Sequence, residues 1–172
     1  AREKSTGTFE TLMTTPVKDG QVVLAKFIGS YLFFLIAFLP TLSYPFILEH
    51  YAHQPPAVDV RAVLSTGLGV ALIGAFFMAL GCFASSLTRS QIVAAVLTFA
   101  LATSLFIAGY LAAARPSEIN WWHQVFQHIS MLNHMRDFAT GIVDTRHIIF
   151  YLSLTGVLLF LTLKPVESRH WK

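Results

Sequence analysis

The sequence predicts an all-α integral membrane protein with four transmembrane helices. Of its 172 residues, 55% are hydrophobic and only 12% are charged, and the mean hydropathy is +0.61. Soluble domains are closer to a quarter charged, and one of this length could not bury so much apolar surface. Four long apolar stretches lack any charged residue, and none alternates in polarity as a barrel strand does, so helices are the expected spans.

The charge-free stretches indicate where the spans lie. They cover residues 27–48, 62–88, 90–114 and 147–163, and are 22, 27, 25 and 17 residues long. A helix needs about 20 residues to cross a bilayer, with a lower limit of about 17. We expect one transmembrane domain, 27–163, with spans at about 27–48, 62–86, 91–114 and 147–163. Pro40 and Pro45 should kink the first span or end it early.

The basic residues predict the orientation of the spans. Four spans place both ends of the chain on one side, which collects eight basic residues: Arg2, Lys4, Lys18, Lys26, Arg89, Lys164, Arg169 and Lys172. The other side has four, namely Arg61, Arg115, Arg136 and Arg146. Because Lys and Arg are enriched in cytoplasmic loops, both termini, including the tail 164–172, are expected in the cytoplasm. These residues form no stripe, so nucleic acid is not an expected partner.

Residues 1–26 are expected to form a cytoplasmic amphipathic helix and an elbow before the first span. An apolar stripe recurs at helical spacing through Phe9, Leu12, Met13 and Val17. Pro16 should end this helix, and Asp19 can cap a new helix that continues into the membrane. The amphipathic helix either lies on the lipid surface or docks on a cytoplasmic partner, and composition leaves both alternatives open.

The segment 115–146 is expected on the opposite, extracytoplasmic side. Apolar residues recur there at steps of mostly three and four, through Trp121, Trp122, Val125, Phe126, Ile129, Leu132, Met135 and Phe138. Tryptophan favours the headgroup level of a bilayer. The pattern predicts an interfacial or re-entrant helix that is too polar to span.

The second span carries small residues at helical spacing. They are Gly67, Ala71, Ala75 and Ala79, with Gly74 and Gly81 beside that row. Small residues let helix backbones approach closely in lipid. We predict helix packing at Gly67, Ala71, Gly74, Ala75 and Gly81, and favour contacts within the chain over a seam between subunits.

Several kinds of active site are not indicated. His123, His128 and His134 are five and six residues apart, which is unlike a zinc site, and they are interpreted as polar residues of the interfacial helix. The first three spans hold no acid, base or histidine of the kind that ion-driven transporters bury. The sequence also lacks a phosphate-binding loop. We therefore expect no cofactor and no enzymatic activity, and any ATP hydrolysis would belong to another chain.

The N-terminal segment resembles a known family. The order of Glu3, Lys4, Gly7, Thr8, Glu10, Leu12, Thr15, Pro16, Val17, Val23, Leu24 and Lys26 is similar to the loop after the second span of ABC-2 type permeases. The similarity is strongest to the branch of the gliding-motility-associated and nitrous-oxide-reductase maturation permeases, although Ala25 replaces their usual glycine. In this family the loop is a coupling helix that sits in a groove of the ATP-binding subunit. The resemblance assigns ATPase coupling to Gly7, Thr8, Phe9, Glu10, Leu12, Met13, Thr15, Pro16 and Lys26.

The segment before the last span resembles the same branch. Phe138, Gly141, Asp144 and Arg146 match its pattern, and His147 stands where an acidic residue is usual. In the family this segment caps the exit path between two subunits, which implies an outer gate at Phe138, Gly141 and Asp144. The family has six spans, so the resemblance implies two further spans before Ala1.

The resemblance implies a permease subunit of an ATP-driven exporter in an inner or plasma membrane. Its partners would be an ATP-binding subunit, a second permease subunit that is identical or different, and membrane lipid. Two alternatives remain. One is a membrane assembly factor or anchor whose segment 8–17 docks another partner, and the other is a membrane metalloenzyme that uses the extracytoplasmic histidines.

Overall fold

The computed structural model describes residues 19–51, 59–88, 90–114 and 130–167, and within these ranges every regular element is a helix. The helices are α3 (Asp19–Phe38), the 3-10 helix η1 (Leu39–Ser43), α4 (Tyr44–Tyr51), α5 (Val60–Leu87), α6 (Gln91–Ala114), α8 (Met131–Ala139) and α9 (Thr145–Glu167). The predicted all-α class is therefore confirmed.

Within the described residues, four stretches are long and apolar enough to cross a membrane. They are Gly20–Tyr51, Val60–Leu87, Gln91–Leu111 and Thr145–Pro165. Each contains most or all of one charge-free run of the sequence. The last run has only 17 residues between Arg146 and Lys164. Helix α9 is nevertheless 23 residues long, because it extends beyond this run into the polar residues at both ends.

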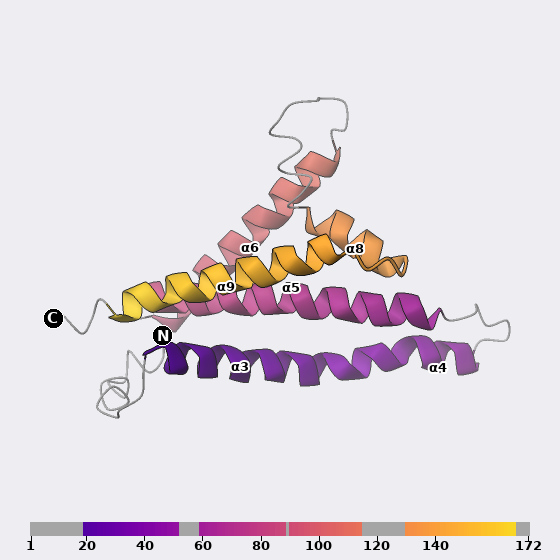
Figure 1. Ribbon diagram of the computed structural model, residues 1–172, viewed down its shortest axis with the longest axis horizontal. Coiled ribbons are helices and arrows are strands. Elements are labelled where there is room, and N and C mark those ends of the chain that lie inside the picture. Colours follow the sequence, from indigo (N-terminus) through magenta and orange to yellow (C-terminus); the bar gives the residue numbers. More distant parts are fainter. Residues whose placement is uncertain (1–18, 52–58, 89, 115–129, 168–172) are drawn as a thin grey trace.

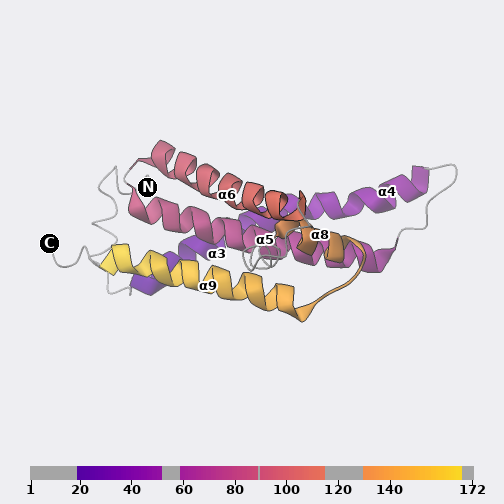
Figure 2. The ribbon, with the colours of Figure 1, turned by 90° about the horizontal axis from the view of Figure 1, so that it is seen from above.

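The helices run alternately up and down around α5, which packs against α3, α6, α8 and α9 (Figures 1 and 2). We call the end of the bundle where α3 begins and α9 ends the proximal end, and the end where α5 begins the distal end. The link between α5 and α6 also lies at the proximal end (Figure 1). Helix α8 lies against α5 towards the distal end.

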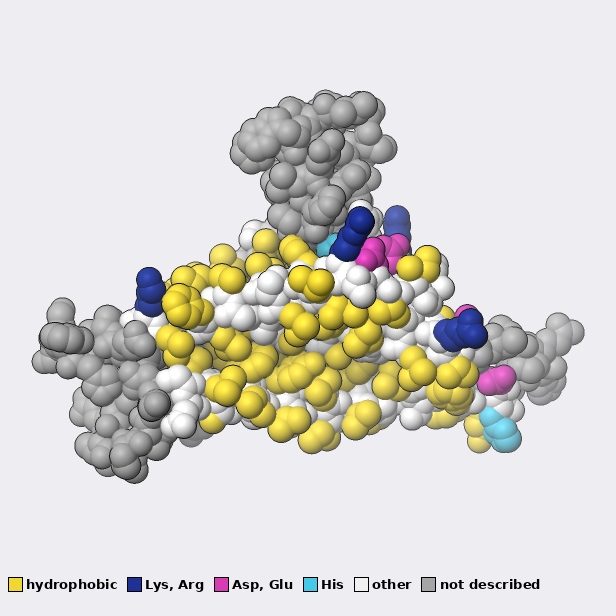
Figure 3. Space-filling view, viewed as in Figure 1, with side chains coloured by type: hydrophobic (Ala, Val, Ile, Leu, Met, Phe, Trp, Pro, Cys, Tyr) yellow, Lys and Arg dark blue, Asp and Glu magenta, His cyan; other side chains and the backbone are white. Residues whose placement is uncertain are grey.

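The buried core is small, and apolar side chains cover much of the surface. The core cluster consists of Leu72, Phe76, Met131, Phe138 and Tyr151. Large side chains such as Phe33, Ile92 and Phe99 are each more than 70% exposed. In Figure 3 hydrophobic side chains cover the length of the bundle, whereas charged side chains lie near its ends and beside α8. Such a surface suits lipid or another apolar protein surface.

The first span is interrupted where the prolines occur. Helix α3 ends at Phe38, and a 3-10 turn with Pro40 in its first turn joins it to α4. Proline lacks the N–H that would bond to the carbonyl four residues earlier, and its ring crowds that carbonyl. The 3-10 turn accommodates this defect, and the chain continues as a second helix.

An aromatic ladder joins α3 to α5. Phe27, Tyr31, Phe34 and Phe38 stack along one face of α3, with neighbouring ring centroids 5.8 to 6.5 Å apart. The Tyr31 hydroxyl donates a 3.2 Å hydrogen bond to the Ala71 carbonyl on α5. The Phe34 ring fills the space at Gly74, where an added Cβ would lie 2.1 Å from Phe34 Cε1. Only glycine allows α3 and α5 to approach this closely.

Candidate functional site

The two candidate sites differ in how far the structure describes them. Of the predicted coupling residues, those from position 7 to position 16 lie outside the described residues: Gly7, Thr8, Phe9, Glu10, Leu12, Met13, Thr15 and Pro16. Lys26 is exposed on α3, about 10 Å along the helix from its first residue. The predicted gate residues are all described. We call α8, the 140–144 turn, the start of α9 and the α5 residues that they contact the distal site.

The buried face of α8 differs from the predicted one. The sequence pattern predicts a stripe through Leu132, Met135 and Phe138, but the buried residues are Met131, His134 and Phe138. Leu132 and Met135 are only half-buried. His134, which the sequence analysis interprets as a polar residue of this helix, thus lies on its buried face. Its burial is tolerated because a polar partner, the Tyr151 hydroxyl, reaches it from α9.

Phe138 fixes the end of α8 to the flank of α5. Its side chain is fully buried and lies on Gly69, where an added Cβ would be 2.6 Å from Phe138 Cδ2. The Ser65 hydroxyl donates to the Phe138 carbonyl, and the Thr66 hydroxyl approaches the same oxygen at 3.4 Å. Gly69 is about 14 Å from the start of α5, so α8 lies along the side of α5 and not across its end.

The turn between α8 and α9 is closed by local hydrogen bonds. Gly141 has a φ of +82°, a left-handed conformation that favours glycine. Its N–H donates to the Phe138 carbonyl at 3.1 Å, and the Ile142 N–H donates to the Asp137 carbonyl at 3.0 Å, which together form a Schellman motif. Asp144 then accepts a 2.8 Å bond from the Arg146 N–H and caps α9.

The structure thus places the three predicted gate residues in one connection, each with its own local role. Phe138 anchors α8, Gly141 reverses the chain, and Asp144 starts α9. The turn also lies beside the first residues of α5, since an added Cβ at Gly141 would be 3.7 Å from the Ala62 nitrogen. A shift of α8 would therefore also displace the distal ends of α5 and α9.

A cluster of polar side chains in the distal site was not predicted. His134 Nδ1 lies 3.1 Å from the Tyr151 hydroxyl oxygen, and the rings of His134 and His147 are 4.1 Å apart. His147 Nε2 is 3.8 Å from Asp137 Oδ2. The spacing of these residues in the sequence could have indicated the cluster. His134 and Asp137 are three residues apart on α8, and His147 and Tyr151 are four residues apart on α9, so each pair lies on one face of its helix. Among the described residues, no three metal-binding side chains are grouped so that they could hold a metal ion.

The predicted helix-packing residues face other helices of the same chain. Gly74 and Ala75 are buried, and the Ala71 carbonyl accepts the bond from Tyr31. An added Cβ at Gly67 would lie 3.1 Å from Leu42 Cδ2, and one at Gly81 would lie 3.9 Å from Thr98 Cγ2. Sequence reasoning missed Gly69, which lies between two members of the row and against the Phe138 ring of α8.

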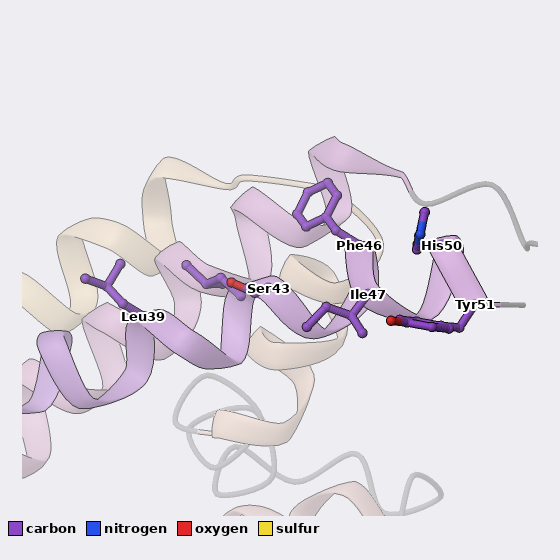
Figure 4. Close-up of a pocket in the computed structure, with 7 residues that line it drawn as sticks. Leu39, Ser43, Phe46, Ile47, His50 and Tyr51 are labelled. Carbon is purple, nitrogen blue, oxygen red and sulfur yellow. The ribbon is translucent and has the colours of Figure 1, made fainter.

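An open apolar groove follows η1 and α4. It is lined by Leu39, Leu42, Ser43, Phe46, Ile47, His50 and Tyr51, all from this one stretch of the first span (Figure 4). The ring of His50 contacts that of Tyr51 edge-on, with centroids 5.3 Å apart. Most of the lining side chains are exposed, so the groove is a surface feature of the distal half of the bundle.

The fold and the distal site define a multi-pass helical membrane protein. In the described part of the chain, three of the four apolar spans pack against the fourth, α5, and a short helix packs beside the connection to the last span. Residues 1–165 match the family described as ABC-2 family transporter protein, and the chain belongs to this family of transport permeases. Comparisons with curated proteins and with solved structures gave no match.

Proposed function

We propose that the chain is the membrane-spanning permease subunit of an ATP-driven exporter, in which a separate subunit binds and hydrolyses ATP. The observation that carries this proposal is the family match over residues 1–165, which includes all four membrane-capable helices and the segment before them. Membrane proteins of this family typically partner with an ATP-binding subunit. The sequence itself has no phosphate-binding loop.

The segment from Gly7 to Pro16 would carry the coupling. Its apolar stripe suits a groove on a cytoplasmic ATPase, with Glu10 at the rim. Helix α3 begins at Asp19, shortly after this segment in the sequence, and is continuous from there to Phe38. Because the Phe34 ring fills the space at Gly74, a push on the start of α3 would reach α5 through direct contact.

The remaining parts of the proposal follow from the topology. With both termini in the cytoplasm of an inner or plasma membrane, the distal site faces outward and Phe138, Gly141 and Asp144 belong to an exit gate. A second permease subunit, identical or different, would complete the path, since four or six helices do not easily enclose one. The exposed apolar faces of α3 and α6 suit such a subunit and lipid.

Replacing Leu12 and Met13 together by alanine in the full-length protein tests the coupling. Burial of such side chains contributes about 1.5 to 3 kcal/mol each before ordering costs. Losing both should weaken binding of the ATPase at least about tenfold. We expect reduced copurification of the ATPase and reduced transport-coupled ATP hydrolysis.

The matched control replaces Thr11 and Thr14, which lie off the apolar stripe of the same helix, and should leave both readouts unchanged. Normal binding and hydrolysis in the Leu12, Met13 variant, with normal membrane insertion, would exclude the coupling role. The segment would then be a helix on the lipid surface. Binding of a protein that does not hydrolyse ATP would instead favour an anchor or assembly factor.

A further inference from the structure

We propose that the groove along η1 and α4 binds one phospholipid, with an acyl chain in the groove and an ammonium head group beside Glu49 and Tyr51. Lipid surrounds any spanning bundle, but a site with a fixed position and a preferred head group is a further property of this chain. It is independent of the coupling role and of an ATPase.

The groove has the length of one bilayer leaflet. It extends from Leu39 to Tyr51 (Figure 4). Five residues in 3-10 conformation and eight in α conformation give it an axial length of about 20 Å. Half of a bilayer, with its head-group region, measures about 20 to 22 Å. Tyr51 ends the 32-residue span Gly20–Tyr51 and Leu39 lies near its middle, so the groove reaches from the bilayer centre to the head groups.

The polarity of the groove changes along its length as that of a phospholipid does. The inner part is lined by Leu39, Leu42, Phe46 and Ile47, and the Ser43 hydroxyl is the one polar group among the lining residues there. His50 and Tyr51 line the distal end, with their rings edge-on and the centroids 5.3 Å apart. An acyl chain therefore matches the inner part, and a polar head group matches the distal end.

Glu49 gives the distal end a negative charge. It follows Phe46 by three residues on α4 and so borders the face that carries the groove. It is exposed and is the one formal charge between positions 39 and 51. The Tyr51 ring beside it is 77% exposed and can receive a cation on its face. A carboxylate and an aromatic ring together favour an ammonium group and oppose an anionic head group.

The size of the groove favours a lipid over a second protein subunit. Its seven lining residues all come from η1 and α4, and α4 has no buried residue. A stable subunit interface uses about 20 to 30 residues on each side. Arg61, at the start of neighbouring α5, is not among the described lining residues, so the groove itself offers no cation to an anionic lipid.

The test maps bound lipid by photocrosslinking in the full-length protein, without the ATPase. Nanodiscs contain equal amounts of phosphatidylethanolamine and phosphatidylglycerol with identical acyl chains. A trace of one or the other carries a diazirine in its acyl chain, and crosslinked peptides are quantified by mass spectrometry. Exposed Phe99 and Phe106 on α6 provide the internal reference. We expect the ratio of phosphatidylethanolamine to phosphatidylglycerol crosslinks to be about two- to fivefold higher at residues 39–51, the range for one exposed charge pair.

Variants at the distal end identify the cause of the preference. Glu49→Gln should bring the ratio to that of the α6 reference, whereas Glu49→Asp, the matched control, should keep it. Tyr51→Leu should lower the ratio, and Tyr51→Phe, which retains a ring, should not. An equal ratio at the groove and at α6 in the wild-type protein would overturn the proposal, as would a preference that persists in Glu49→Gln. Crosslinks at α6 with none in the groove would assign the groove to a protein surface and would also overturn it.

Discussion

Gly69 allows the ring of Phe138 to lie directly on the backbone of α5, and this contact is one of those that position α8. Neighbouring Ser65 and Thr66 turn their hydroxyls towards the Phe138 carbonyl, so an apolar and a polar contact act at the same residue. The sequence shows Gly69 as one more small residue of the second span. Its partner, 69 positions later in the chain, is visible only in the folded protein.

Gly69→Ala should destabilise the distal site. The new methyl would lie 2.6 Å from Phe138 Cδ2 and 3.1 Å from its Cβ, and rotating the ring cannot move that Cβ. Overpacking of this kind costs about 1 to 3 kcal/mol. We expect a lower midpoint of thermal unfolding in detergent.

Gly156→Ala on α9 is the control, because nothing lies within 4 Å of its added methyl. There the change should be neutral or stabilising by up to about 1 kcal/mol, since alanine favours a helix over glycine. An equal loss of stability in the two variants would show that the contact with Phe138 is not responsible.

At the scale of elements, the spans could be predicted and the short helix only in part. A charge-free apolar run of about 17 residues or more has one physical solution in lipid, which is a helix, so the four spans follow from the sequence. Helix α8 has nine residues, too few for its periodicity to select between adjacent faces. Its buried face includes His134, and a histidine becomes acceptable there only once Tyr151 and His147 are in place.

The turn between α8 and α9 gives a prediction that discriminates between side chains. Gly141→Val should strain the connection, because a left-handed residue costs about 1 to 2 kcal/mol for an ordinary side chain and more for a β-branched one. Gly141→Asn should cost less, since asparagine visits this conformation. Hydrogen exchange of the α8 amides in nanodiscs should rise in the valine variant and change little in the asparagine variant. Equal exchange in the two would mean that the conformation at Gly141 does not limit the stability of α8.

At the scale of the whole molecule, charge divides the bundle into two unlike ends. The described basic residues of the proximal end, Lys26 and Lys164, lie on the first and last spans. The distal end carries Arg61, Arg136 and Arg146 together with the acids Glu49, Asp59, Asp137 and Asp144. The four-span topology predicted from the sequence assigns eight basic residues to the side of the termini and four to the opposite side, which is the basis for the proposed orientation.

Cysteine labelling tests this orientation with a matched pair of exposed positions. Glu49→Cys lies near the distal end of the first span and Lys164→Cys near the proximal end of the last, and each is made in a Cys82→Ala background. With a membrane-impermeant maleimide on intact cells, we expect labelling at position 49, and at position 164 only after the membrane is permeabilised. The positive-inside bias acts through the energy of moving Lys and Arg across the bilayer, so the side with more of them should remain cytoplasmic. The reverse pattern would place the segment before α3 outside, away from any cytoplasmic ATPase.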